Sequence, residues 1–84
     1  MYNSITTDAI ELAIKKAGAK GQTPLEAARR FRGLTSAKLA GLVGTSAPTI
    51  GRLENGYRPG LALKSALARE LDCPPDLLFP HAPT

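Results

Sequence analysis

The sequence has little of the residues on which most catalytic and metal-binding sites depend. Its 84 residues include one cysteine, one histidine and no tryptophan. A single thiol excludes an intrachain disulfide and a cysteine-rich zinc site, so we expect Cys73 to be a small core residue in a reducing compartment. There is also no glycine-rich phosphate loop and no plausible pairing of acidic and nucleophilic residues. We therefore predict no enzyme activity, no catalytic residue, no metal and no cofactor.

Long hydrophobic runs are missing too. No apolar stretch approaches the ~20 residues that cross a bilayer, and the N-terminus lacks the basic and then apolar pattern of a secretory signal. We expect a cytoplasmic protein without membrane association. The length allows one domain with a modest core. A net charge of +4 and a pI near 9.6 favour a polyanionic partner without identifying it.

The most informative stretch is residues 39–56, LAGLVGTSAPTIGRLENG. Apolar residues at helical spacing predict two short helices, and Gly44 between them suits the positive φ of a helix end. Ser46 is a candidate N-cap for the second helix, and Pro48 falls in its first turn, where a missing N–H costs little. This is the layout of a helix-turn-helix whose second helix enters a DNA major groove, although spacing alone also fits any helical hairpin in a small bundle.

Capping signals predict further helices on both sides of this stretch. Thr7 is a candidate N-cap for a helix ending near Ala17. Thr23 and Glu26 have the spacing of a capping box around Pro24, and the helix that follows is expected to end near Arg32. Thr35 is expected to cap a helix over 36–43. Leucine spacing and prolines predict two more helices, over about 60–71 and 75–79.

The first predicted helix has an apolar stripe formed by Ile10, Ile14 and Ala17. Such a helix either covers part of the bundle or acts as a dimerisation or DNA-reaching arm, and the stripe does not decide between these interpretations. Phe31 is an apolar residue in need of cover. We predict that Ile10 and Ile14 pack over its ring, in the same chain or in a dimer mate.

From residue 25 to residue 79 the chain resembles the Cro and lambda-repressor-like helix-turn-helix family of the XRE type. The family pattern runs G-L-T-x-x-x-L-A-x-x-x-G-x-S-x-x-T-I-x-R-x-E-x-G, followed by a proline, a leucine-rich helix and D-x-L-F. The matching residues are Gly33, Leu34, Thr35, Leu39, Ala40, Gly44, Ser46, Thr49, Ile50, Arg52, Glu54, Gly56, Pro59, Leu61, Leu67, Ala68, Leu71, Asp76, Leu78 and Phe79. The resemblance implies an all-α, compact five-helix bundle, to which the N-terminal helix is an addition.

The resemblance also implies a domain organisation. Residues 1–22 are an N-terminal helical extension and linker, residues 23–79 are the helix-turn-helix domain, and residues 80–84 are a disordered tail. The recognition helix is expected at about residues 46–54.

The DNA-binding residues that the resemblance implies lie on and around the two central helices. They are Thr35, Ser36, Ser46, Ala47, Pro48, Thr49, Arg52, Asn55, Tyr57 and Arg58. Arg52 is the only long donor on the recognition helix, with guanine O6 and N7 or a phosphate as its expected partner. Ala47 and Pro48 cannot donate hydrogen bonds from their side chains, but they can pack against a thymine methyl group.

Two further positions carry an expected structural ion pair. Glu54 stands at the exit of the recognition helix, where its charge gains nothing from the helix dipole. By resemblance its partner is Arg29, whose planar guanidinium suits a bidentate pair with a carboxylate.

These expectations define a sequence-specific regulator that binds double-stranded DNA. We expect a transcriptional repressor of bacterial or phage type, located on the nucleoid when bound, which acts as a homodimer on a palindromic operator. The alternative is a protein-interaction module, such as an antitoxin or adaptor that retains the fold and binds a protein partner. The poor donor content of Ala47 and Pro48 keeps this alternative open.

Overall fold

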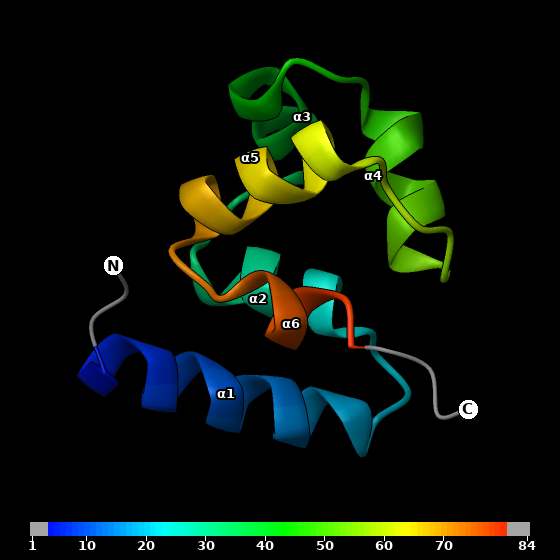
Figure 1. Cartoon of the computed structure of the whole chain (residues 1–84). Helices are drawn as coiled ribbons and strands as arrows, with labels where there is room; N and C mark the ends of the chain where they lie inside the picture. Colours follow the sequence, from blue (N-terminus) through cyan, green and yellow to red (C-terminus); the bar gives the residue numbers. More distant parts are fainter. Residues whose placement is uncertain (1–3, 81–84) are drawn as a thin grey trace.

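The computed structural model describes residues 4–80, and within this range the chain forms helices and no strand (Figure 1). The helices are α1 (Ser4–Gly18), α2 (Pro24–Phe31), α3 (Ser36–Val43), α4 (Ala47–Glu54), α5 (Leu61–Leu71) and α6 (Pro75–Leu78). The predicted all-α fold, with a five-helix bundle and an additional N-terminal helix, is confirmed. The predicted tail beyond Pro80 falls outside the described residues, as do residues 1–3.

The core is built from leucines, isoleucines and small residues that the sequence spaces along each helix. Every helix contributes at least one side chain that is nearly or fully inaccessible to solvent, and the largest of these are Ile10, Leu25, Leu39, Ile50, Leu67, Leu71 and Leu78. Full burial of a side chain of this size stabilises a fold by about 1.5–3 kcal/mol. Cys73 is also fully buried in this core, as the sequence predicted.

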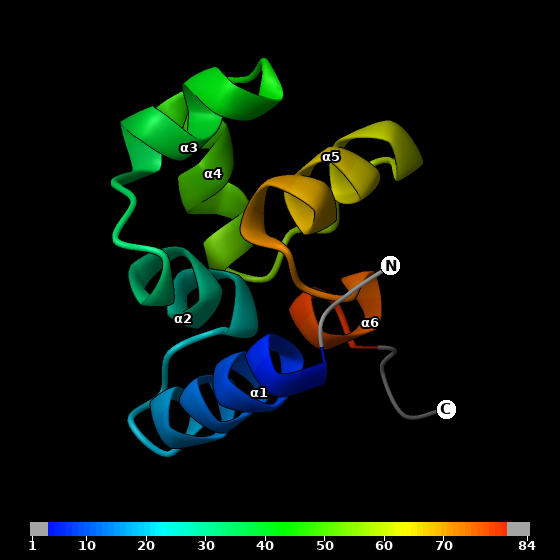
Figure 2. The ribbon, with the colours of Figure 1, turned by 90° about the vertical axis from the view of Figure 1, so that its left-hand side faces the viewer.

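Helix α1 packs along α2, at the opposite end of the molecule from α3 (Figures 1 and 2). The predicted apolar stripe is confirmed, because Ile10 and Ala17 are buried and Ile14 packs against the core. The predicted start is wrong. The helix begins at Ser4, so Thr7 lies in its first half rather than at its N-cap. No glycine or proline stands in residues 4–7 to interrupt the helix.

The predicted cover for Phe31 is incomplete within this chain. Phe31 remains 41% exposed, while Ile10 is fully buried in the central core. The neighbouring Arg32 places its guanidinium carbon 5.2 Å from the centre of the Phe31 ring. Arg32 therefore makes a cation–π contact with this ring.

Helix α2 starts at the predicted Pro24, but the predicted capping box is not formed. The backbone of Thr23 is extended, as an N-cap requires, while its hydroxyl oxygen is buried and makes no hydrogen bond. The carboxylate of Glu26 turns instead to Arg30, whose Nε donates to Oε2 at 3.1 Å. An ion pair one turn along the helix has therefore replaced the capping interaction.

Candidate nucleic-acid interface

The turn between α3 and α4 is fixed by local hydrogen bonds. At the start of α3, the hydroxyl of Thr35 accepts from the amide of Lys38 at 3.1 Å. At its end, Gly44 has a φ of 75°, and the amide of Thr45 donates to the carbonyl of Ala40 at 2.9 Å. This left-handed residue reverses the chain within a few residues, because glycine adopts positive φ without steric cost.

Helix α4 begins with a second side-chain cap. The Ser46 hydroxyl accepts from the amide of Thr49 at 3.3 Å and lies 2.9 Å from the Thr49 hydroxyl. Pro48 occupies the first turn, where no amide donor is needed. Ile50 and Leu53 are buried against the bundle. The cap and the two buried side chains together set which face of α4 is turned outward.

The outward face of α4 carries Pro48 and Arg52, and Asn55 follows at its C-cap; all three residues are exposed. These residues are spaced by four and three positions, so they lie in one row along the helix. Ala47 and Thr49 border this row and are half-buried. Arg52 is the only side chain of the row that can reach several ångströms beyond the helix surface.

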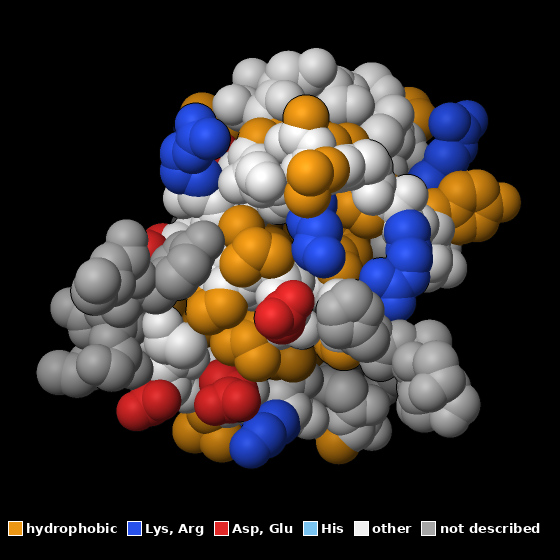
Figure 3. Space-filling model, viewed as in Figure 1, with side chains coloured by type: hydrophobic (Ala, Val, Ile, Leu, Met, Phe, Trp, Pro, Cys, Tyr) orange, Lys and Arg blue, Asp and Glu red, His pale blue; other side chains and the backbone are white. Residues whose placement is uncertain are grey.

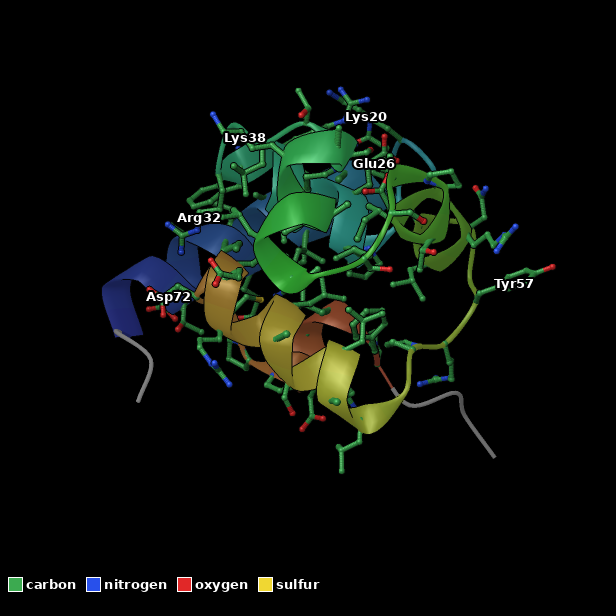
Figure 4. All side chains as sticks on the ribbon, turned by 90° about the horizontal axis from the view of Figure 1, so that it is seen from above. Lys20, Glu26, Arg32, Lys38, Tyr57 and Asp72 are labelled. Atoms are coloured by element: carbon green, nitrogen blue, oxygen red, sulfur yellow. The ribbon has the colours of Figure 1, made fainter. Side chains whose placement is uncertain are left out.

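The start of α3 adds a second contact region. Thr35 is exposed and Ser36 is half-buried in the first turn, where backbone amides and the helix dipole favour an anion such as phosphate. Lys38 is exposed in the same turn, and its side chain points away from the bundle (Figure 4). Sequence reasoning did not include Lys38 among the site residues. Its position in the first turn behind the Thr35 cap is the signal that identifies it.

The loop after α4 contributes Tyr57 and Arg58. The Tyr57 side chain is 67% exposed and projects away from the bundle (Figure 4). Arg58 is also exposed, but its Nη2 donates to the carbonyl oxygen of Pro80 at 2.7 Å. The guanidinium therefore holds the loop against the end of the chain segment that follows α6, and its other donors form no hydrogen bond with a described residue.

Arg29 connects the two helices of the turn to α2. Its Nε donates to Glu54 Oε2 at 2.6 Å, and its Nη2 donates to Glu54 Oε1 at 3.3 Å. A third donor, Nη1, reaches the carbonyl oxygen of Leu34 at 2.9 Å. The two side chains are only 11% and 12% exposed. The hydrogen bond to Glu54 raises the pKa of Arg29 above its ordinary value.

This bidentate pair has a direct consequence for the surface. Glu54 is the last residue of α4, and Leu34 directly precedes the Thr35 cap of α3. One guanidinium thus fixes the end of α4 and the entrance of α3 on the same helix. The exposed row on α4 and the first turn of α3 are held in one relative orientation.

The charges around this surface favour an anion. Figure 3 shows Lys and Arg side chains on the side of α4 and its following loop, while acidic side chains gather over the beginning of α1. Between residues 35 and 58 the charged side chains are Lys38, Arg52, Glu54 and Arg58. Because Glu54 is neutralised by Arg29, the cationic side chains dominate the field over this surface.

The described residues hold neither a candidate metal site nor a membrane-spanning helix. Residues 4–80 contain no group of three or more His, Cys, Asp or Glu side chains that could hold a metal ion. None of the helices described is both long enough and apolar enough to cross a membrane.

A tight turn between two capped helices, with the second helix exposed and a cationic rim, is the geometry of a helix-turn-helix DNA-binding domain. The sequence profile of the helix-turn-helix family matches residues 25–78, which run from α2 to the end of α6. The chain therefore belongs to this family, in its XRE-type, lambda-repressor-like branch. No curated protein matches the chain in a sequence search.

Proposed function

We propose that the protein is a sequence-specific transcriptional repressor that acts in the cytoplasm of a bacterial or phage-infected cell. It occupies an operator and blocks access to it. Residues 23–79 are the DNA-binding domain in this proposal, and residues 1–22 are an extension. The observation that supports it most is the exposed row of α4, Pro48, Arg52 and Asn55, presented beside the first turn of α3.

In the proposed complex, α4 enters the major groove. Arg52 donates to O6 and N7 of a guanine, which is the commonest specific contact of an arginine with DNA. Ala47 and Pro48 pack against a thymine methyl group, and the hydroxyls of Ser46 and Thr49 lie near phosphates or base edges. With these few contacts, α4 recognises only a few base pairs.

The phosphates on either side of the groove are contacted by the flanking elements. Thr35, Ser36 and Lys38 supply backbone amides, hydroxyls and one ammonium group at the start of α3. Asn55, Tyr57 and Arg58 supply donors from the loop after α4. The Arg29–Glu54 pair has a positioning role, because it holds these two phosphate-binding regions at a fixed separation.

A single short recognition helix offers too few base contacts for a specific site, so the proposal includes a homodimer on a palindromic operator. The two half-sites are then about one helical turn of DNA, roughly 34 Å, apart. The family resemblance suggests residues 77–79, near the C-terminus, as one candidate dimer surface. Leu78 and Phe79 are buried in the chain's own core, which makes that region a poor candidate.

The alternative proposal is a protein-interaction module that keeps this fold. It is favoured by the low donor content at the start of α4, where Ala47 and Pro48 offer no side-chain hydrogen bond. An adaptor or antitoxin would use the exposed row on α4 to pack against a protein.

The two proposals differ in what they predict for binding to random duplex DNA. A DNA-binding protein neutralises phosphates and releases counterions, so its affinity falls steeply between low and moderate salt. We expect this fall, and we expect selection from a random duplex library to yield an inverted repeat. A protein without affinity for any duplex at low salt would refute the repressor and favour the interaction module.

A further inference from the structure

A second surface lies on the other side of α2. Between the C-terminal half of α1 and α2 runs a groove of about 330 Å³. Its apolar lining comes from Ala13, Ala17, Ala27 and the ring of Phe31. Because three of these side chains are alanines, the groove is wide enough to admit a larger apolar side chain from outside. Phe31, one of these lining residues, is 41% exposed.

The rim of the groove is cationic. Lys16, Lys20 and Arg30 border it. Arg30 is paired with Glu26, with Nη2 and Oε2 3.0 Å apart. Lys16 and Lys20 form no ion pair with any side chain of the described residues. An apolar floor with two unpaired ammonium groups at its edge is complementary to an apolar side chain flanked by carboxylates.

The outer face of α1 presents such a side chain. Leu12 is 53% exposed, at the centre of the face that points away from the bundle. Asp8 is exposed one turn before it, and Glu11 precedes it directly. The acidic side chains seen over the beginning of α1 in Figure 3 belong to this half of the helix, whereas Lys15, Lys16 and Lys20 follow in and after the other half.

We propose that the groove receives the α1 helix of a second copy of this chain, in an antiparallel pair with two-fold symmetry. The partner's Leu12 enters the groove at the level of Lys16, and the partner's Asp8 then lies opposite Lys20. Because the helices are antiparallel, the same contacts recur with the roles of the chains exchanged, and the pair closes after two copies.

This inference rests on the homodimer of the proposed function and names its surface. It uses a helix outside residues 25–78, the part that the family profile matches. A helix of 15 residues is about 22 Å long. The interface is therefore at the small end of specific protein contacts, and we expect self-association at micromolar concentrations rather than an obligate dimer.

The first test is sedimentation equilibrium of the full chain without DNA, from micromolar to hundreds of micromolar. The wild-type protein should show a monomer–dimer equilibrium. Leu12→Asp should raise the dissociation constant by at least tenfold. Leu61→Asp is the matched control, since Leu61 is 81% exposed on α5 and away from the groove, and it should leave the equilibrium unchanged. A wild-type protein that is monomeric throughout, or a control that weakens the dimer as much as Leu12→Asp, overturns the proposal.

The second test uses the charges. Asp8→Lys places two ammonium groups opposite each other at both ends of a homodimer, and Lys20→Glu does the same with two carboxylates. Each variant alone should be mostly monomeric. An equimolar mixture should dimerise, because both of its contacts then join a lysine with a carboxylate. Failure of the mixture to associate more strongly than the separate variants overturns the antiparallel register.

These experiments separate the proposal from the proposed function, because self-association is measured without DNA. A dimer with the predicted variant behaviour supports the surface even if no duplex binds. If the wild-type chain is monomeric and Lys20→Glu instead weakens binding to random duplex DNA severalfold, the groove faces the DNA backbone and the dimer is refuted.

Discussion

The ion pair between Arg29 and Glu54 offers a quantitative prediction about how the interface is held. The pair is bidentate, both side chains are nearly nine-tenths buried, and Arg29 makes a further hydrogen bond to the carbonyl of Leu34. Replacing either residue by alanine leaves the other charge in a poorly hydrated position. We therefore expect each single substitution to cost far more than the loss of a surface ion pair.

The magnitude follows from this burial. Breaking a buried pair from one side typically costs about 3–5 kcal/mol, because the remaining charge is stranded. Arg29→Ala should be the more costly by about 1 kcal/mol, since it also removes the hydrogen bond to Leu34. In the double variant no charge is stranded. The coupling energy between the two substitutions should then be about 2–3 kcal/mol.

Urea denaturation followed by circular dichroism measures these free energies of unfolding for the wild type, the two single variants and the double variant. Arg30→Ala is the control on the same helix. Its pair with Glu26 leaves the arginine side chain 61% exposed, so the substitution should cost less than about 1 kcal/mol. A coupling energy below about 0.5 kcal/mol would show that Arg29 and Glu54 do not act as a buried pair.

Three further predictions concern single residues. Arg52→Ala should weaken operator binding by about 1–3 kcal/mol and relax the preference at one base pair, whereas the control Arg69→Ala on α5 should leave binding unchanged. Equal weakening on every DNA sequence would identify Arg52 as a phosphate contact instead. Gly51→Ala should raise the free energy of unfolding by about 1 kcal/mol, because no atom beyond its chain neighbours and the adjacent backbone of α4 lies within 4 Å of an added Cβ. A loss of stability in urea denaturation would contradict this, and a loss of DNA affinity would show that α4 approaches the duplex closely at this position. Burial raises the pKa of the Cys73 thiol from its usual 9.0 to about 11. The stabilisation of the fold by the neutral thiol is therefore complete below pH 9.0, the pKa of the unfolded chain, and is lost as the pH rises through about 11, the pKa in the folded protein. Between these pH values the free energy of unfolding of the wild type should fall by about 2–3 kcal/mol more than that of Cys73→Ala. If the free energies of the two proteins instead depend on pH in the same way, the buried thiol does not titrate as described.

The helix-turn-helix itself could be predicted residue by residue because its boundaries are encoded locally. Thr35 and Ser46 each bond an amide three residues ahead, and Gly44 adopts the positive φ that ends α3. Such signals need no knowledge of the rest of the molecule. The Arg29–Glu54 contact joins residues 25 positions apart, and only the family resemblance indicated it.

The errors of sequence reasoning occur where a side chain had several partners within reach. Glu26 could cap α2 or pair with Arg30, and the second interaction is formed. The sequence marks Arg32 only as the residue near which a helix ends, yet its Nε donates to the carbonyl of Leu71 at 2.9 Å and connects the end of α2 to the end of α5. Arg58 similarly reaches Pro80. Choices of this kind depend on the tertiary arrangement, which local spacing does not contain.

We expect α4 and the first turn of α3 to face the DNA, and amide chemical-shift mapping measures which residues do so. Duplex DNA is added to nitrogen-labelled protein at low salt, and the perturbed amides are located on the structure. We predict that the shifts cluster in residues 35–38, 46–52 and 55–58, with little change along α1. Perturbations centred on the groove between α1 and α2, with those three segments unaffected, would contradict this expectation.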